Sequence, residues 1–215
     1  EIPAITEVMQ SRSNILPLSH LIPRLYPFFR HAVLNVRLSV VNTIYSFLRT
    51  TDLIWPDRSW IKEPLLCLIF QNFILELKPN LIDRTLEVWT YLVSYIDKHN
   101  ILETELNSDT FPTTTLSSWF ALAMMPVGFP LNTKYFIPCN PNDTTTKIAP
   151  HDRAVCNQDL TVASEDDIIL GRLSGCTALG RLVNILLQKD NEVSKNTISE
   201  LSKAYTTSGW VGHRL

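Results

Sequence analysis

One segment in the last third of the chain has the glycine spacing of a phosphate-binding loop. Residues 175–182 read GCTALGRL, so two glycines are followed at once by a basic residue. Loops that cradle the phosphates of ATP require Lys and then Ser or Thr, where this chain has Arg181 and Leu182. The segment also falls inside a helical pattern instead of following a strand. We therefore interpret Gly175 and Gly180 as sites of close helix packing and predict no cofactor site in this chain.

Three residues that could bind a metal occur together in an irregular part of the sequence. Cys139, His151 and Cys156 carry the sulfur and nitrogen atoms that zinc prefers. Structural zinc sites have four ligands, usually in closely spaced pairs, and the spacing here is wider. We predict no metal site. We also predict no catalytic residue, because no Ser, Cys or carboxylate is placed by sequence to form a nucleophile pair with one of the scattered histidines, His20, His31, His99 and His213.

The composition is typical of a folded, mainly helical protein. Of the 215 residues, 45% are hydrophobic and 19% are charged, which supplies a core and argues against a disordered tail. Only 6 glycines are present, fewer than a β-sandwich usually needs for its turns, and the 13 prolines are expected at helix starts and in loops. The formal net charge of −2 gives no overall positive field for DNA or RNA.

Cysteine usage and hydropathy indicate the compartment. The four cysteines are widely spaced and form no CxxC pair, so we expect reduced thiols, with Cys67 and Cys176 buried in helices. The N-terminal residues lack the layout of a signal peptide. The stretch Ile168–Leu187 is long enough to span a membrane, but it carries Arg172 and Arg181. We expect it to pack inside a helical protein, without a membrane partner.

Apolar residues at helical spacing predict a series of helices that could position these groups. The first pair is Ser19–His31 and Val36–Arg49, with Ser19 and Asn35 as N-caps. Ser164 caps a later helix and has Asp167 three positions on, a variant of the capping box. We interpret the acidic residues that follow Ser164 as a complement to the helix dipole and not as a metal site. The further predicted helices are Trp60–Leu77, Leu81–Ile96, Thr115–Met125, Ser164–Gln188 and Asn196–Tyr205.

Helix pairs in series, joined by short breaks such as Lys78-Pro79-Asn80, indicate an all-α solenoid of HEAT-like repeats. A non-repeating helical bundle is the structural alternative. Four residues of the first pair define the repeat. Pro23 lies in the first turn of its helix and Pro27 should kink that helix. Val36 should pack inward, and Arg37 can bond across the turn to the adjacent repeat.

The organisation along the chain has three parts. Residues 1–126 are predicted to form HEAT-like repeats, and residues 162–215 to add further HEAT-like helices that are cut short at the end. Residues 127–161 read as a loop or insertion that could be disordered in part, because they hold four prolines and no sustained period. The tryptophans without interleaved basic residues read as core or inter-repeat anchors and not as a base-stacking platform: Trp55, Trp60, Trp89 and Trp119.

The residues of the first pair also resemble a known family. The sequence LIPRLYPFFRH of residues 21–31, with Val36 and Arg37 after it, is similar to the middle HEAT region of the Swi/Snf-type ATPases that act on TATA-binding protein, the "modifier of transcription" family. Supporting similarities follow in the same order at residues 88–89, 119–125 and 167–186. The resemblance spans residues 18–187, and residues 131–160 depart from its pattern.

The resemblance implies a long HEAT array joined to a C-terminal ATPase in the nucleus. Such proteins use ATP and Mg to remove TATA-binding protein from promoter DNA and so regulate transcription. Their main grip on TATA-binding protein lies nearer the N-terminus than this segment, and their phosphate-binding loop lies downstream. No functional residue is therefore transferred to a position of this chain, and we expect neither end of it to be natural.

Two functional hypotheses remain at this point. In the first, the segment is a non-catalytic scaffold between adjacent HEAT repeats of a DNA-dependent ATPase. In the second, it is a solenoid adaptor of a transport or trafficking complex that binds peptides. A free-standing enzyme has no support from the sequence.

Overall fold

A computed structural model of the protein describes residues 17–54, 58–104, 114–125, 135–137, 164–188 and 192–207. Every regular element in these ranges is helical, which confirms the predicted all-α fold. The elements, in chain order, are α2 (Leu18–Leu21), the 3-10 helix η2 (Ile22–Arg30), α3 (Leu34–Ile54), α4 (Glu63–Leu75), α5 (Pro79–Lys98), α6 (Ile101–Thr104), α7 (Leu116–Met124), α9 (Glu165–Gln188) and α10 (Glu192–Thr207).

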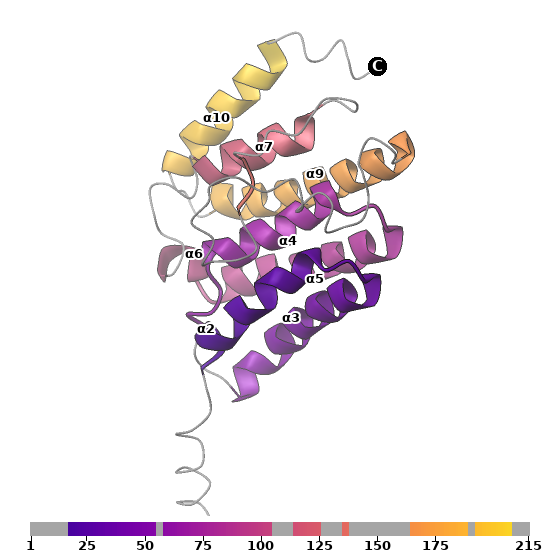
Figure 1. The fold of residues 1–215 in the computed structure, drawn as a ribbon. Coiled ribbons are helices and arrows are strands. Elements are labelled where there is room, and N and C mark those ends of the chain that lie inside the picture. Colours follow the sequence, from indigo (N-terminus) through magenta and orange to yellow (C-terminus); the bar gives the residue numbers. More distant parts are fainter. Residues whose placement is uncertain are drawn as a thin grey trace, which may run out of the picture.

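The helices stack as pairs in two layers, as a solenoid requires (Figure 1). One layer holds η2, α4 and α7, and the other holds α3, α5 and α9. Within each layer, neighbouring helices contact one another, and the contacts of η2 with α3, α4 with α5, and α7 with α9 join the layers. Residues 126–163 therefore connect the two helices of one pair, and α10 packs on α7 and α9.

The first predicted helix is correct in position but not in type. It divides into the short α2 and a nine-residue 3-10 helix, which contains Pro23 near its start and Pro27 inside it. In an α-helix the ring of Pro27 would clash with the backbone carbonyl four residues earlier. The segment winds as a 3-10 helix where a kinked α-helix was expected.

Both N-caps predicted for the first pair are wrong. Pro17 precedes α2 without a side-chain cap, and Ser19 lies inside the first turn. The helix α3 begins at Leu34, before Asn35, and the Val33 carbonyl accepts its first hydrogen bonds. The turn is closed instead by His31, whose Nδ1 accepts a hydrogen bond from the Val33 N–H at 3.1 Å.

In the second pair, α4 is shorter at both ends than the sequence indicated, and α5 is longer at both ends. The helix α4 begins at Glu63 with Pro64 in its first turn, so Trp60 lies in the preceding turn. Pro79 is the first residue of α5, as expected for a proline after a break. Lys78 precedes α5 without a side-chain cap.

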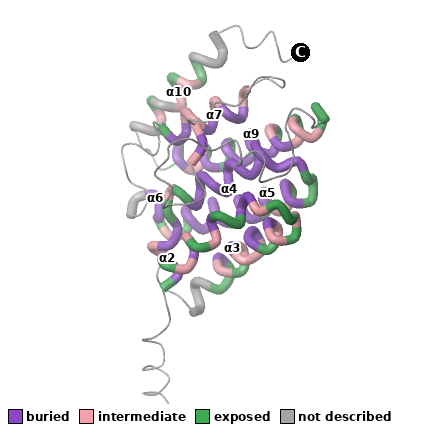
Figure 2. Tube along the Cα trace, viewed as in Figure 1, coloured by how far each residue is buried: buried purple, intermediate pink, exposed green. Residues whose placement is uncertain are grey.

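The core is centred on α4 (Figure 2). Every residue from Leu65 to Leu75 in this helix is buried, because other elements surround it. From this helix, Phe70 stacks on Trp119 with ring centroids 4.6 Å apart. Trp89 meets both rings at an angle. The anchor role predicted for Trp60, Trp89 and Trp119 is confirmed by their burial; Trp55 lies outside the described residues.

The helix α9 packs against α4, α5, α7 and α10, and this agrees with the packed helix predicted from its arginines. By length and composition alone it is the one helix in the described ranges that could cross a membrane. The predicted Ser164 cap is confirmed, because its hydroxyl accepts a hydrogen bond from the Asp167 N–H at 3.2 Å. The Asp167 carboxylate returns to the Ser164 hydroxyl, which donates to it.

Glycines bring α9 close to α4 in two places. A Cβ atom added at Gly171 would lie 2.3 Å from the Phe73 carbonyl oxygen, and one at Gly175 would touch the Phe73 and Ile74 side chains. The close packing predicted at Gly175 is therefore confirmed. It is wrong for Gly180, where an added Cβ would meet nothing within 4 Å.

Three residues of the predicted insertion belong to the core. Phe136 is buried in the hydrophobic cluster, and Tyr135 and Ile137 pack against it. The rest of residues 127–161, including Cys139, His151 and Cys156, lies outside the described residues, as does the C-terminal tail from residue 208.

The two cysteines that the structure describes are free thiols. Cys67 is buried in α4, whereas Cys176 is only half-buried, so the predicted burial is correct for the first and overstated for the second. Burial, with a smaller contribution from the Glu63 carboxylate, raises the pKa of Cys67 to about 12.

Replacing Gly171 with Ala should destabilise the protein by about 1–3 kcal/mol, because the new methyl group overlaps the Phe73 backbone. Gly180→Ala in the same helix is the matched control, and should leave the stability unchanged or raise it by about 0.5–1 kcal/mol. Urea denaturation followed by circular dichroism measures both. Equal effects of the two substitutions would contradict the close approach of α9 to α4.

The raised pKa predicts that Cys67 is inert in the folded protein. At about pH 8 its thiolate, the form that reacts, should be roughly a thousandfold scarcer than for a thiol of ordinary pKa. In a Cys139→Ser, Cys156→Ser background, iodoacetamide should modify Cys67 only after urea is added, and Cys176 should react first. Mass spectrometry of the peptides reads this out, and rapid native labelling of Cys67 would refute it.

Candidate functional site

The first structural site is a buried ion pair between the first two helix pairs. Arg37 of α3 and Glu76, which follows α4, are 2% and 3% exposed. The Arg37 Nε donates to Glu76 Oε2 at 2.7 Å, and a terminal nitrogen donates to Oε1 at 3.2 Å. The other terminal nitrogen donates to the carbonyls of His31 and Ala32. One guanidinium thus ties the turn before α3 to the end of α4.

Both carboxylate oxygens of Glu76 accept hydrogen bonds. Besides Arg37, its Oε1 accepts hydrogen bonds from the backbone N–H groups of Leu77 and Lys78, each at 3.0 Å. Glu76 therefore supports the break between α4 and α5, although no side chain caps α5 from Lys78. The sequence analysis missed this residue. Its signal was a lone acidic group in an apolar run from Leu65 to Leu77.

The four repeat-defining residues occupy different environments. Pro23 is half-buried and Pro27 is exposed on η2. Arg37 makes the contacts described above. Val36 does not point into the core as expected; it is half-buried, and the inward position one turn later is taken by Val40. The buried face of α3 is centred on Val40 and Ile44.

Further polar contacts join the remaining helices. Arg30 of η2 is buried and donates to the Asn72 side chain of α4. The Trp89 indole N–H of α5 donates to the Ala178 carbonyl of α9 at 2.8 Å. The Thr115 hydroxyl, just before α7, donates to Glu63 of α4. Each contact fixes one helix relative to a neighbour from another pair, so they act as ties between repeats.

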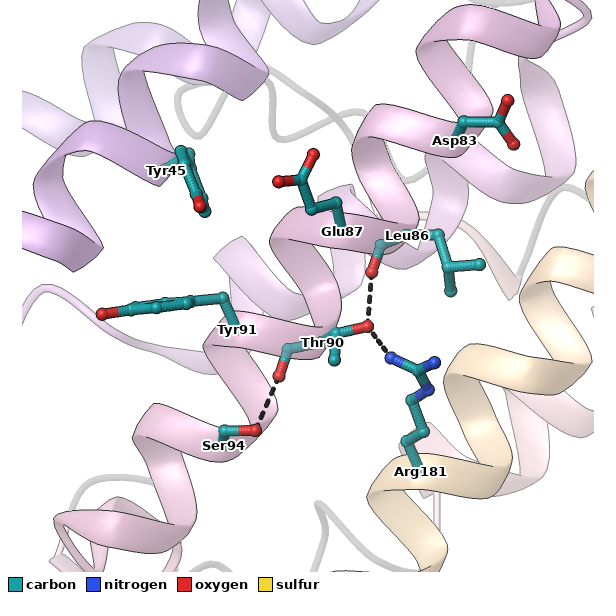
Figure 3. A pocket seen from close by; sticks show the side chains of 8 residues that line it. All are labelled: Tyr45, Asp83, Leu86, Glu87, Thr90, Tyr91, Ser94 and Arg181. Atoms are coloured by element: carbon teal, nitrogen blue, oxygen red, sulfur yellow. Dashed lines mark hydrogen bonds between the residues drawn. The ribbon is translucent and has the colours of Figure 1, made fainter.

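A second site is an open groove on the layer of α3, α5 and α9, with a volume of about 520 Å³ (Figure 3). Its walls combine aromatic, acidic, hydroxyl and basic groups. The lining residues are Tyr45 from α3, Asp83, Leu86, Glu87, Thr90, Tyr91 and Ser94 from α5, and Arg181 from α9. Sequence analysis predicted none of them as site residues, because they lie on three helices and share no motif.

Arg84 shapes the α3 side of this groove. Its guanidinium carbon lies 4.2 Å from the centroid of the Tyr45 ring, and its Nε donates to Asn42 Oδ1 at 2.7 Å. It also pairs with Glu87 one turn along α5. Tyr91 meets Tyr45 edge to face, with ring centroids 5.6 Å apart. The aromatic wall is therefore held in place by cation–π and ring contacts.

No His or Cys lines the groove. In the ranges that the structure describes, no group of three His, Cys, Asp or Glu side chains could hold a metal ion. The groove presents charged groups, hydroxyl groups and aromatic surface.

Comparison with known families extends this description. A family model described as "Domain of unknown function (DUF3535)" matches residues 88–211, more than half of the chain. The chain belongs to this family. The match to DUF3535 begins inside α5 and takes in α7, α9 and α10, so it includes Arg181 and one end of the groove.

The DUF3535 chain is also similar to curated proteins. It is 30% identical over 143 residues to "TATA-binding protein-associated factor mot1" of Aspergillus fumigatus, which is 62% of this chain and 7% of that protein. It is 32% identical over 108 residues to MOT1 of Saccharomyces cerevisiae, 50% of this chain and 6% of that protein. With BTAF1 of Arabidopsis thaliana it shares 30% over 151 residues, 65% of this chain and 7% of that protein. These matches confirm the resemblance inferred from the sequence. The chain spans less than a tenth of the length of these relatives.

Removing one partner of the buried ion pair should be costly. Arg37→Ala leaves the Glu76 carboxylate buried without its cation, and should lower the free energy of unfolding by about 3–5 kcal/mol. Adding Glu76→Gln to Arg37→Met removes both charges but keeps an oxygen for the Leu77 and Lys78 N–H groups. The double variant should recover more than half of the loss in urea denaturation. If the losses of stability caused by Arg37→Met and by Glu76→Gln, each measured alone, add up to the loss in the double variant, the two charges do not depend on each other.

Proposed function

We propose that this chain is a non-catalytic HEAT-like scaffold segment of a nuclear, ATP-dependent factor that removes TATA-binding protein from promoter DNA. The similarity to proteins named TATA-binding protein-associated factors supports the transcriptional role. Its position between other HEAT repeats is part of the proposal. In this role the segment binds neither ATP nor Mg, which would act in the ATPase part of the longer protein.

The observation that carries the scaffold role is the set of ties between helix pairs. Arg37 with Glu76 and Arg30 with Asn72 join the first pair to the second. The Trp89 indole joins the second pair to α9 of the third. Each repeat of a solenoid contacts mainly its neighbours, so its shape depends on the interfaces between repeats. Buried polar contacts at these interfaces fix the angle between pairs more strictly than apolar packing does, because hydrogen bonds are directional.

A scaffold of this kind would act by holding two parts of the longer protein at a fixed distance and angle. A protein that hydrolyses ATP at one place and releases a bound partner at another needs a connection with a defined length and angle. The stack described here provides such a connection without a reacting group. The proposal therefore predicts that variants at the ties change the coupling between the two events, and leave each event by itself intact.

The test uses the full-length protein that contains this chain. Arg37→Ala should leave binding of TATA-binding protein and DNA-stimulated ATP hydrolysis within about twofold of the unmodified protein, and slow ATP-dependent release of TATA-binding protein from promoter DNA by about tenfold, the equivalent of roughly 1.4 kcal/mol. Gel-shift and ATPase assays measure the three quantities.

Two variants control for general damage. Arg24→Ala removes an exposed arginine from the same pair and should have no effect. The Arg37→Met, Glu76→Gln double variant, which removes both charges, should restore part of the release rate. Normal release by Arg37→Ala, or ATP hydrolysis by the 215-residue chain alone, would contradict the proposed role.

A further inference from the structure

The helix α9 keeps an exposed apolar stripe along one side. Six large apolar side chains are exposed in the described ranges, and three of them belong to this one helix. They are Ile169, Leu173 and Leu187, which are 42%, 61% and 41% exposed. Single apolar residues scattered over a protein surface are ordinary, whereas several on one face of one helix indicate a contact surface.

The stripe has the spacing of a helix-packing seam. Its members are residues 169, 173, 176, 180, 183 and 187, which are alternately four and three positions apart and therefore lie along one line of the helix. Cys176 and Val183 within this line already pack against the edge of the core. A four-three spacing is typical of helices that cross at a small angle, so the stripe favours a helix as its partner over a loop or a strand.

Gly180 lies in the middle of the stripe. A Cβ atom added there would meet nothing within 4 Å, whereas Gly171 and Gly175, on the opposite side of α9, lie against α4. A glycine in a helix lowers its stability unless the missing side chain serves close packing. The backbone of another helix can therefore approach α9 closely at Gly180, as α4 does at Gly171.

The order of the layers indicates which helix belongs on this face. In the second layer α3 contacts α5, and α5 contacts α9. The contacts from α5 reach Ala178 and Arg181, on the other flank of α9. The stripe thus faces the next position along the layer. The helix α10 contacts α7 and α9, which already form a pair with each other, and it leaves the stripe exposed.

We propose that the stripe of Ile169, Leu173, Gly180 and Leu187 is the docking face for the helix that follows α10 in the longer protein. That helix pairs with α10 and lies beside α9, as α9 lies beside α5. Its own apolar residues follow the same four-three spacing, and its backbone comes closest at Gly180. The inference rests on the proposed position of this chain between other HEAT repeats.

Two observations favour this occupant over a second copy of the chain. A stable dimer buries roughly 1,600 Å² in total, and three partly exposed side chains on one helix provide much less. The similar proteins also contain more than ten times the length that this chain covers, so further helices are available within one molecule. A contact within one chain needs less buried area, because it does not pay the entropy of association.

The test measures the reactivity of single cysteines in the full-length protein that contains this chain. In a Cys176→Ser background, Leu173→Cys places a thiol on the stripe, and Asp83→Cys places one at an exposed position of α5. N-ethylmaleimide should modify position 173 about tenfold more slowly than position 83, because the docked helix covers only the first. Mass spectrometry of the peptides gives both rates. Equal rates would overturn the proposal, and so would protection that disappears on dilution, which indicates a second copy.

Cross-linking identifies what covers the stripe. A maleimide–diazirine reagent attached at position 173 should join to a peptide within about 40 residues after residue 215, the length of one HEAT repeat. Cross-links to any other part of the protein, or to TATA-binding protein, would overturn the proposal. Gly180→Phe should raise the labelling rate at position 173 several-fold, because the ring occupies the place of closest approach. An unchanged rate would contradict helix packing at this glycine.

The result can be separated from the test of the scaffold role. Labelling at position 173 reports on the neighbour of α9, whereas the Arg37→Ala experiment reports on release of TATA-binding protein. If position 173 reacts freely while Arg37→Ala slows release, the docking proposal fails and the scaffold role stands. If position 173 is protected and release by Arg37→Ala is normal, the docking proposal stands and the scaffold role fails.

Discussion

The ion pair of Arg37 and Glu76 determines how the first two helix pairs meet. Both groups are buried. Arg37 donates to two backbone carbonyls before α3, and Glu76 accepts from two backbone N–H groups after α4. A buried pair of this kind adds little net stability, because the cost of removing both charges from water offsets most of their attraction. What it adds is geometry. An arrangement in which η2 and α3 shifted along α4 would leave two charges buried and unpaired, so the pair selects one register among the apolar packings that are otherwise similar.

The close approach of α9 to α4 is the complementary constraint at the other end of the stack. The backbone of Phe73 lies where only a glycine, Gly171, can face it. This contact lets α9 reach α5, where the Ala178 carbonyl accepts the Trp89 indole N–H. The positions of α5 and α9 then set the width of the groove, since Arg181 is one turn beyond Ala178 and reaches Thr90. The groove is thus a consequence of how the core packs.

Most of the fold could be predicted from the sequence, because apolar periodicity reports which face of each helix is buried. The face of α5 that includes Ile82, Trp89 and Ile96 is an example. The helix starts were harder to predict, since an N-cap depends on which backbone N–H groups the first turn leaves without an acceptor. The contact that closes the turn before α3, from the Val33 N–H to His31, follows no common capping pattern. The 3-10 winding of η2 also differs from the kinked α-helix that its prolines led us to expect. The groove could not be predicted, because it exists only where residues 45, 83–94 and 181 meet.

The two layers differ in what they expose. The layer of η2, α4 and α7 contains the fully buried helix and two of the four polar ties between pairs. The layer of α3, α5 and α9 presents exposed charges and hydroxyl groups that few core contacts involve. Substitutions at Asp83 or Glu87 should therefore leave the stacking of the helices unchanged, because both side chains are exposed. Substitutions at Glu76 should disturb it, because this buried carboxylate holds Arg37 and two backbone N–H groups.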